Sequence, residues 1–169
     1  MGKASLPQQR RRAREIALQL IYELDLRPDL THEEAIEMFP FDAENPDVAA
    51  YAKRLVRTAS EKNEEIDGLL REHIIGWRME RMVAVDRAAI RIALSEGVLV
   101  GSVPVAVAIS EAVELTKIFG TEESSRFVNG VLGRIVRSGE NKNIEADNTE
   151  ENIEEPEESG EAGRASGEP

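Results

Sequence analysis

The amino-acid sequence predicts an all-α protein, a compact helical domain followed by an acidic tail. Apolar residues recur at intervals of three and four, the spacing of one face of a helix. Prolines and helix-capping residues separate these segments. Only the Val-rich stretch VLVGSVPVAVA has a composition that would also suit a strand. We therefore expect about seven helices and no sheet.

The first helix is expected over residues 7–26, ahead of Pro28, because proline interrupts a helix. Its apolar stripe comprises Ala13, Ile16, Ala17, Leu20, Ile21 and Leu24. Thr31 and Glu34 have the spacing of a capping box, which predicts a short helix that ends near Phe39. Asn45 followed by Pro46 predicts the start of a third helix. Its stripe comprises Val48, Ala52, Leu55, Val56 and Ala59.

Four further helices complete the expected domain. A short one is predicted over residues 64–74. Residues 82–100 are apolar on two faces, which is typical of a central helix with neighbours on both sides. The first of these faces comprises Val85, Ala89 and Ile92, and the second comprises Val83, Ile90 and Leu94. A helix from residue 104 should stop at Gly120, and Thr121 should cap the last helix. The core face of that last helix centres on Val128, Val131, Leu132 and Ile135.

The acidity of the chain is concentrated in its last segment. Residues 139–169 hold 11 acidic and 2 basic side chains, a net charge of -9 out of -12 for the whole chain. They contain too few apolar residues to offset the entropy lost on ordering. We expect a helical domain over residues 1–138 and a disordered tail over residues 139–169.

Several classes of function lack their signatures. There is no Cys, which excludes thiol catalysis and thiolate metal sites and fits a cytoplasmic protein. His32 and His73 have no second ligand at metal-binding spacing, and no phosphate-binding glycine loop occurs. No apolar run approaches the roughly 20 residues of a membrane span. We expect neither an enzyme nor a bound cofactor or metal.

A basic arm opens this acidic chain and continues into the first helix. Arg11, Glu15, Leu18 and Tyr22 share the stripe opposite the predicted core, with Arg14 alongside. Guanidinium groups bind phosphates and a tyrosine ring can stack on an unpaired base, so this stripe suggests a nucleic-acid surface. Equally, Leu18 and Tyr22 could pack against a neighbouring helix.

Two phenylalanines near the end of the domain leave the same choice open. Phe127 lies at the edge of the core stripe of its helix, where it could either pack or contact a ligand. Phe119 lies in the last turn of its helix, within the apolar stripe, and the core is the favoured position for it.

Four blocks occur in the order and at the spacing of one known family. They are RRRAREIALQLIYELDL, VDRAAIRIALSE, VPVAVAISEAVELTKIFG and EESSRFVNGVLGRIV, and together they cover most of residues 1–138. In these blocks the chain resembles the NusB family of bacterial antitermination factors. The resemblance implies two small helical bundles packed together and no enzyme activity. It also implies binding of boxA-type single-stranded RNA together with the small-subunit ribosomal protein NusE, in a complex that helps RNA polymerase read through terminators.

The resemblance also assigns site residues by position. Those that meet RNA would be Arg10, Arg11, Arg12, Arg14, Tyr22, Phe119, Glu123, Ser125 and Phe127. Asp86 and Arg91 match the surface that meets NusE, whereas the residues alone suggest a local ion pair between Asp86 and Arg87.

Two other functions fit the same sequence. The chain could be the RNA-binding domain of a ribosomal RNA cytosine methyltransferase without its catalytic domain, or a scaffold that binds only proteins. Whether it is a monomer or a homodimer is left open.

Overall fold

The computed structural model describes the backbone of residues 2–74 and 79–150. This part of the chain holds seven α-helices and no strand, which confirms the expected all-α fold. The helices are α1 (Leu6–Leu26), α2 (His32–Met38), α3 (Pro46–Glu61), α4 (Asn63–His73), α5 (Ala84–Ala93), α6 (Val105–Phe119) and α7 (Ser124–Glu150). Short 3-10 turns cover Phe41–Ala43 and Met79–Arg81, and a π-helix covers Leu94–Leu99. None of the described helices combines the length and the apolar character that a membrane span requires.

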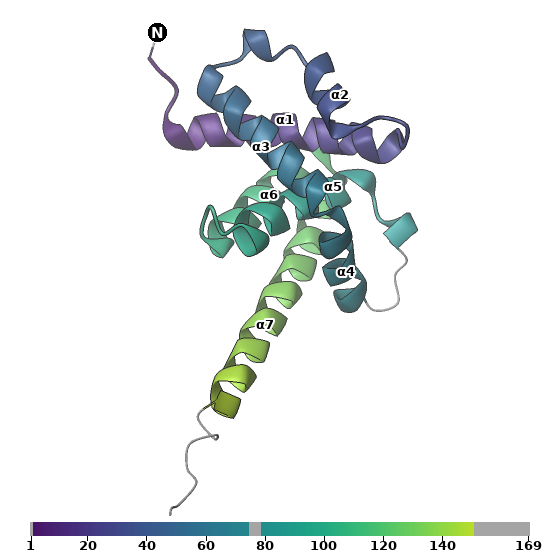
Figure 1. The fold of residues 1–169 in the computed structure, drawn as a ribbon, viewed down its shortest axis with the longest axis vertical. Helices are drawn as coiled ribbons and strands as arrows, with labels where there is room; N and C mark the ends of the chain where they lie inside the picture. The colour runs from purple at the N-terminus through teal and green to yellow at the C-terminus, as the bar shows by residue number, and fades with distance from the viewer. Residues whose placement is uncertain (1, 75–78, 151–169) are drawn as a thin grey trace, which may run out of the picture.

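The helices form two packed groups, as the resemblance implies. In Figure 1, α2 and α3 lie against α1 in one group, and α4 to α7 form the other. α1 packs against both α3 and α5, so it joins the two groups. α7 begins between α5 and α6 and extends away from the rest of the molecule (Figure 1).

The predicted caps form. Thr31 and Glu34 make a reciprocal capping box: the Thr31 N–H donates to Glu34 Oε2 at 2.8 Å, and the Glu34 N–H donates to Thr31 Oγ1 at 3.2 Å. The Asn45 side chain accepts from the Asp47 N–H at 2.8 Å at the start of α3. Ser5 forms a second capping box with Gln8, so α1 begins at Leu6.

The predicted core is largely confirmed. All five stripe residues of α3 and all four of α7 are buried. α5 is central, because five of the six residues from Ala88 to Ala93 belong to the apolar core and the sixth, Arg91, is also buried. Val83 departs from the expectation with 44% exposure, because it precedes the first turn of α5.

The last helix differs from the prediction at both ends. It begins at Ser124, since Thr121 forms a turn in which its N–H donates to Ser124 Oγ at 2.9 Å. It continues to Glu150, past the expected start of a disordered tail. Extending a helix that packing has already nucleated costs far less than starting one, which accounts for the longer helix. Residues 151–169 of the predicted tail lie outside the described residues.

The π-helix packs closely against α6 at Gly97. A Cβ atom placed on Gly97 would lie 2.7 Å from the Ala108 Cβ, closer than side-chain carbons approach one another. Glycine is therefore required here by the contact between two helices. In α4, a Cβ atom on Gly68 would meet nothing within 4 Å.

We expect Gly97→Ala to destabilise the protein by about 1–3 kcal/mol, the usual cost of overpacking a core. Gly68→Ala is the matched control and should be stabilising by about 0.5–1 kcal/mol, because alanine favours a helix. Urea unfolding followed by circular dichroism measures both. Equal stability of the two variants would show that α6 can shift without cost.

Candidate nucleic-acid interface

A groove between α1 and α6 brings several of the predicted residues together. Its lining consists of Arg12, Glu15, Leu18, Gln19 and Tyr22 from α1, Val85 from α5 and Phe119 from the end of α6. Leu18 is 4% exposed, whereas Tyr22 is 39% and Phe119 is 48% exposed. The groove thus has a buried aliphatic side chain and two half-exposed aromatic rings from different helices.

These positions decide two choices that the sequence left open. Leu18 packs in the core, the second of the two alternatives, while Tyr22 remains exposed on the same helix. The favoured core position for Phe119 was wrong, because this ring is exposed. The buried residues of α6 are Ala108, Ala112, Leu115 and Thr116. Phe119 follows in the final turn, where it lines the groove.

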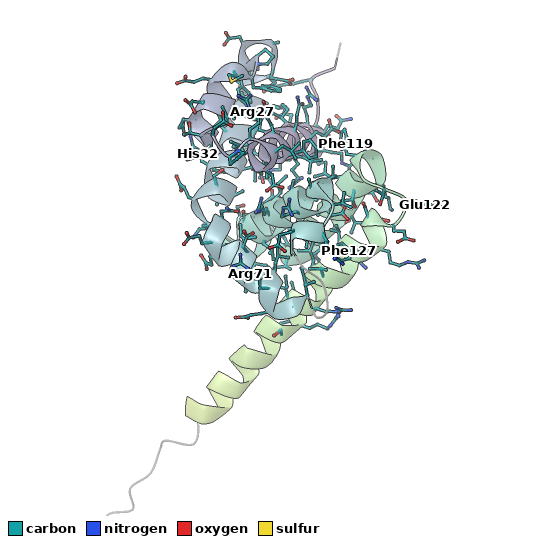
Figure 2. All side chains as sticks on the ribbon, turned by 90° about the vertical axis from the view of Figure 1, so that its right-hand side faces the viewer. Arg27, His32, Arg71, Phe119, Glu122 and Phe127 are labelled. Carbon is teal, nitrogen blue, oxygen red and sulfur yellow. The ribbon has the colours of Figure 1, made fainter. Side chains whose placement is uncertain are left out.

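The other predicted residues of this region lie at the start of α7. Glu123 is exposed, and Ser125 and Phe127 are partly buried. Phe127 packs against the hydrophobic core. In Figure 2, Phe119, Glu122 and Phe127 lie on one side of the molecule, and Arg27, His32 and Arg71 on the other. Phe127 is thus both part of the packing and on the side where Phe119 is exposed.

Two arginines of the basic arm are held by carboxylates from distant parts of the chain. Arg11 makes a two-point contact with Glu111 of α6, Nε to Oε2 at 3.2 Å and Nη2 to Oε1 at 3.1 Å. Arg12 contacts Glu44, with Nε at 3.3 Å from Oε2, and also Glu15. The hydrogen bond from Arg12 lowers the pKa of the Glu44 carboxyl. Nothing near the arm in the sequence indicates Glu44 or Glu111 as partners.

Arg10 lies against an aromatic ring. Its guanidinium carbon is 5.5 Å from the centre of the Tyr51 ring, and that of Arg54 is 4.9 Å from the same centre. Such contacts between cations and ring faces are attractive. Arg10 therefore lies toward α3, away from the groove that Tyr22 and Phe119 line.

The structure contradicts the expected position of Arg14 beside the exposed stripe of α1. Arg14 is 3% exposed and its guanidinium pairs with Glu96 of the π-helix, Nε to Oε2 at 2.9 Å and Nη2 to Oε1 at 2.6 Å. The Tyr51 hydroxyl donates to the same carboxylate. Arg14 is on the face of α1 that packs against α3 and the π-helix, so its guanidinium is not presented to a ligand as expected.

The two residues assigned to a protein partner are also interior. Arg91 is 8% exposed and pairs with Asp25 of α1 and Asp67 of α4, each at 3.1 Å. Asp86 is 4% exposed, and the suggested local pair does not form, because Arg87 pairs with Asp25. Since both side chains are buried where α5 packs on its neighbours, their assignment to an exposed partner surface does not agree with the structure.

Asp86 is a buried carboxyl group with an oxygen that lacks a hydrogen-bond partner among the described residues. Its Oδ1 makes no hydrogen bond within the part of the chain that the structure describes. Burial raises the pKa of the Asp86 carboxyl, and a hydrogen bond with Ser124 at the start of α7 partly opposes the shift. Across the same residues, no three His, Cys, Asp or Glu side chains converge as metal ligands.

Comparison with known proteins gives the family. A sequence model of the NusB family matches residues 11–137. The chain belongs to the NusB family. The transcription antitermination protein NusB of Symbiobacterium thermophilum is 47% identical over 137 residues, which cover 76% of this chain and 89% of that protein.

Solved structures agree with this NusB fold. NusB of T. maritima superposes with a TM-score of 0.70 at 30% identity, covering 81% of this chain and 93% of that one. A crystal structure of the antitermination factors NusB and NusE in complex with double-stranded RNA gives a TM-score of 0.67 at 32% identity. It covers 77% of this chain and 97% of that one. The family match spans the groove and confirms the resemblance seen in the four sequence blocks.

We expect Arg14→Ala to destabilise this NusB-family protein by about 3–5 kcal/mol, because Glu96 would remain buried without its cation. Arg11→Ala is the matched control on the same helix. Its ion pair is exposed and screened by solvent, so its loss should change the stability little. Thermal and urea unfolding compare the two, and a loss no larger for Arg14 than for Arg11 would contradict the structural role.

Asp86→Asn should change how stability depends on pH. The folded-state pKa of Asp86 lies above its ordinary value of 3.8, so the wild-type free energy of unfolding falls as pH rises from that value through the raised pKa. The variant cannot ionise and should therefore be more stable than wild type at neutral pH. The two proteins should converge below pH 3.8. Unfolding across pH 3–8 tests this, with the exposed Asp42→Asn as control; parallel curves for Asp86→Asn and wild type would contradict the raised pKa.

Proposed function

We propose that this protein is a transcription antitermination factor that acts by binding, without catalysis, in the bacterial cytoplasm. Its ligand is boxA-type single-stranded RNA in nascent ribosomal transcripts. It binds this RNA together with the small-subunit ribosomal protein NusE, as part of an RNA polymerase complex. The antitermination role rests on family membership and on the name of the Symbiobacterium relative. The pairing with NusE and with RNA rests on the neighbouring structure of NusB and NusE with double-stranded RNA, and the preference for a single strand rests on the groove.

The observation that carries the RNA assignment is the groove with two exposed rings. Tyr22 and Phe119 project from α1 and α6 beside the Arg12 side chain. Single exposed apolar residues are normal, but two large rings exposed in one groove form an apolar patch of the kind that marks a binding surface. Unpaired bases stack on such rings, and a nearby guanidinium binds the phosphate that follows.

Single-stranded RNA suits this groove better than a duplex. Within a duplex the bases are paired and stacked on each other, so their faces cannot reach Tyr22 or Phe119. Glu15 lines the groove, and the exposed Glu123 follows Phe119 by four residues. Their negative charge limits the attraction that the arm alone can exert on RNA phosphates. A basic ribosomal protein bound beside the RNA would supply the missing positive charge.

Coverage of the relatives supports the antitermination role. The match includes 89% of the Symbiobacterium protein and 93% of the T. maritima NusB chain. This favours an antitermination factor over the RNA-binding part of a methyltransferase. A protein-only scaffold is disfavoured by the exposed rings, since it gives no role to an aromatic groove beside arginines.

We expect Tyr22→Ala and Phe119→Ala each to weaken binding of boxA-type RNA by about 1–3 kcal/mol, the contribution of one stacked base. Both rings are half exposed, so the melting temperature should change little. Fluorescence anisotropy of a labelled RNA measures the affinity, and circular dichroism measures the melting temperature.

Leu26→Ala is the control for this pair of variants, because Leu26 is on α1 one turn after Tyr22 and is 58% exposed outside the groove lining. Unchanged RNA affinity for both ring variants would remove the groove from the RNA site.

A further inference from the structure

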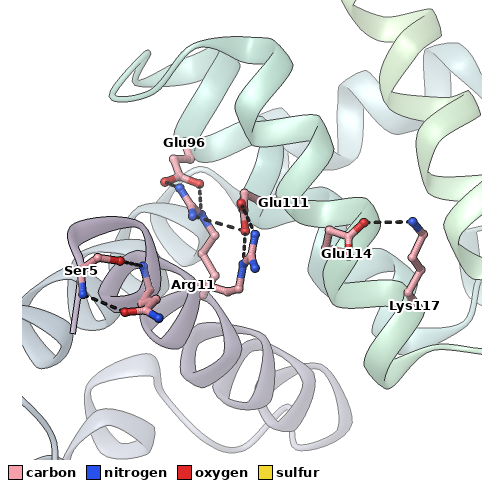
Figure 3. A network of polar contacts seen from close by, with 8 residues as sticks. Ser5, Arg11, Glu96, Glu111, Glu114 and Lys117 are labelled. Carbon is pink, nitrogen blue, oxygen red and sulfur yellow. Dashed lines mark hydrogen bonds and ion pairs between the residues drawn. The ribbon is translucent and has the colours of Figure 1, made fainter. Parts of the chain in front are cut away.

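The contact between Arg11 and Glu111 occupies the atoms with which an arginine holds a phosphate. Arg11 uses Nε and Nη2 to bind both carboxylate oxygens, at 3.2 and 3.1 Å (Figure 3). A guanidinium presents the same pair of donors to the oxygens of a phosphate group. Arg11 therefore cannot keep Glu111 and grip an RNA phosphate in this way at the same time.

Arg12 repeats the arrangement with a different part of the chain. Its Nε and Nη2 contact the two oxygens of Glu44, which follows the 3-10 turn before α3. The two arginine side chains are 55% and 48% exposed, and each acidic partner is 18% exposed. Arg11 and Arg12, the arginines of the arm that are open to an RNA backbone, are thus each paired with a carboxylate from a different element.

We propose that Glu111 and Glu44 act as internal substitutes for RNA phosphates, so that RNA must displace them and the two acids set the affinity of the arm. The proposal rests on the proposed RNA-binding function. Exposed ion pairs are weak, so a phosphate can replace the carboxylate, yet each exchange lowers the gain from the new contact.

The exchange affects contacts to the RNA backbone, which are the same for every base sequence. Freeing the arm should therefore raise the affinity for any single-stranded RNA by a similar factor. Discrimination between sequences is left to contacts with bases in the groove between Tyr22 and Phe119.

The structure offers a matched control on the same helix. Glu114 is one turn from Glu111 and pairs with Lys117, Nζ to Oε1 at 2.9 Å (Figure 3). Glu114→Gln removes the same charge from the same surface and leaves the contact between Arg11 and Glu111 in place. It separates release of the arginine from a general loss of negative charge.

The experiment measures binding of two labelled probes, a boxA-type RNA and an oligouridylate, to the full chain by fluorescence anisotropy at low and high salt. Glu111→Gln and Glu44→Gln should each bind both probes roughly 2- to 5-fold more tightly at low salt, the range that the strength of an exposed ion pair implies. Glu114→Gln should show less gain than either. The gains should shrink as salt is added. In an Arg11→Gln background, Glu111→Gln should give no gain beyond that of Glu114→Gln.

Three results would overturn this proposal alone while RNA binding stands. These are no gain for either variant, an equal gain for Glu114→Gln, and a Glu111→Gln gain that persists without Arg11. Failure of the wild-type protein to bind either RNA at low salt, even with NusE present, would overturn the proposed function and this inference with it. If Glu111→Gln melts early because Arg14 also lies near Glu111, Glu44→Gln decides the question from a separate element.

Discussion

The buried ion pair between Arg14 and Glu96 is the contact on which the arrangement of the site depends. It joins α1 to the π-helix, and the Tyr51 hydroxyl adds α3 to the same carboxylate. Both charged side chains are almost fully buried. Burying two charges is expensive, and the attraction between them repays that cost only if the groups meet in good geometry. The pair therefore favours one rotation of α1 against its neighbours over others that would leave a charge unpaired.

That rotation places the rest of the arm. With Arg14 directed inward, Arg11 and Tyr22 lie on the side of α1 that faces α6. The close approach of α6 depends in turn on Gly97, beside Glu96 in the π-helix. α6 then supplies Glu111 to the arm and Phe119 to the groove. One buried contact and one glycine thus determine which cations and which rings meet at the surface.

The acidic net charge of the chain does not describe the proposed RNA surface. The whole chain carries -12, yet the proposed RNA surface contains an arginine-rich arm. Within the folded protein this arm is partly neutralised by Glu111, Glu44 and the buried Glu96. Its two exposed contacts are exchangeable and the buried one is structural, because the cost of leaving a charge unpaired rises steeply with burial. Neighbouring arginines therefore have different roles.

Most of the fold could be predicted from the sequence, because helices depend on local spacing. The capping box of Thr31 and Glu34, the buried stripe of α3 and the central position of α5 all follow from residues three or four apart. The four family blocks likewise indicated the NusB family. Tertiary structure alone decided that Arg14 is buried against Glu96, 82 residues away, that Leu18 is core, and that Phe119 is exposed. It also placed Asp86 and Arg91 in the interior and assigned carboxylate partners to Arg11 and Arg12. The physical reason is that periodicity identifies which face of a helix is apolar, whereas the burial of a charge depends on which distant element packs against it.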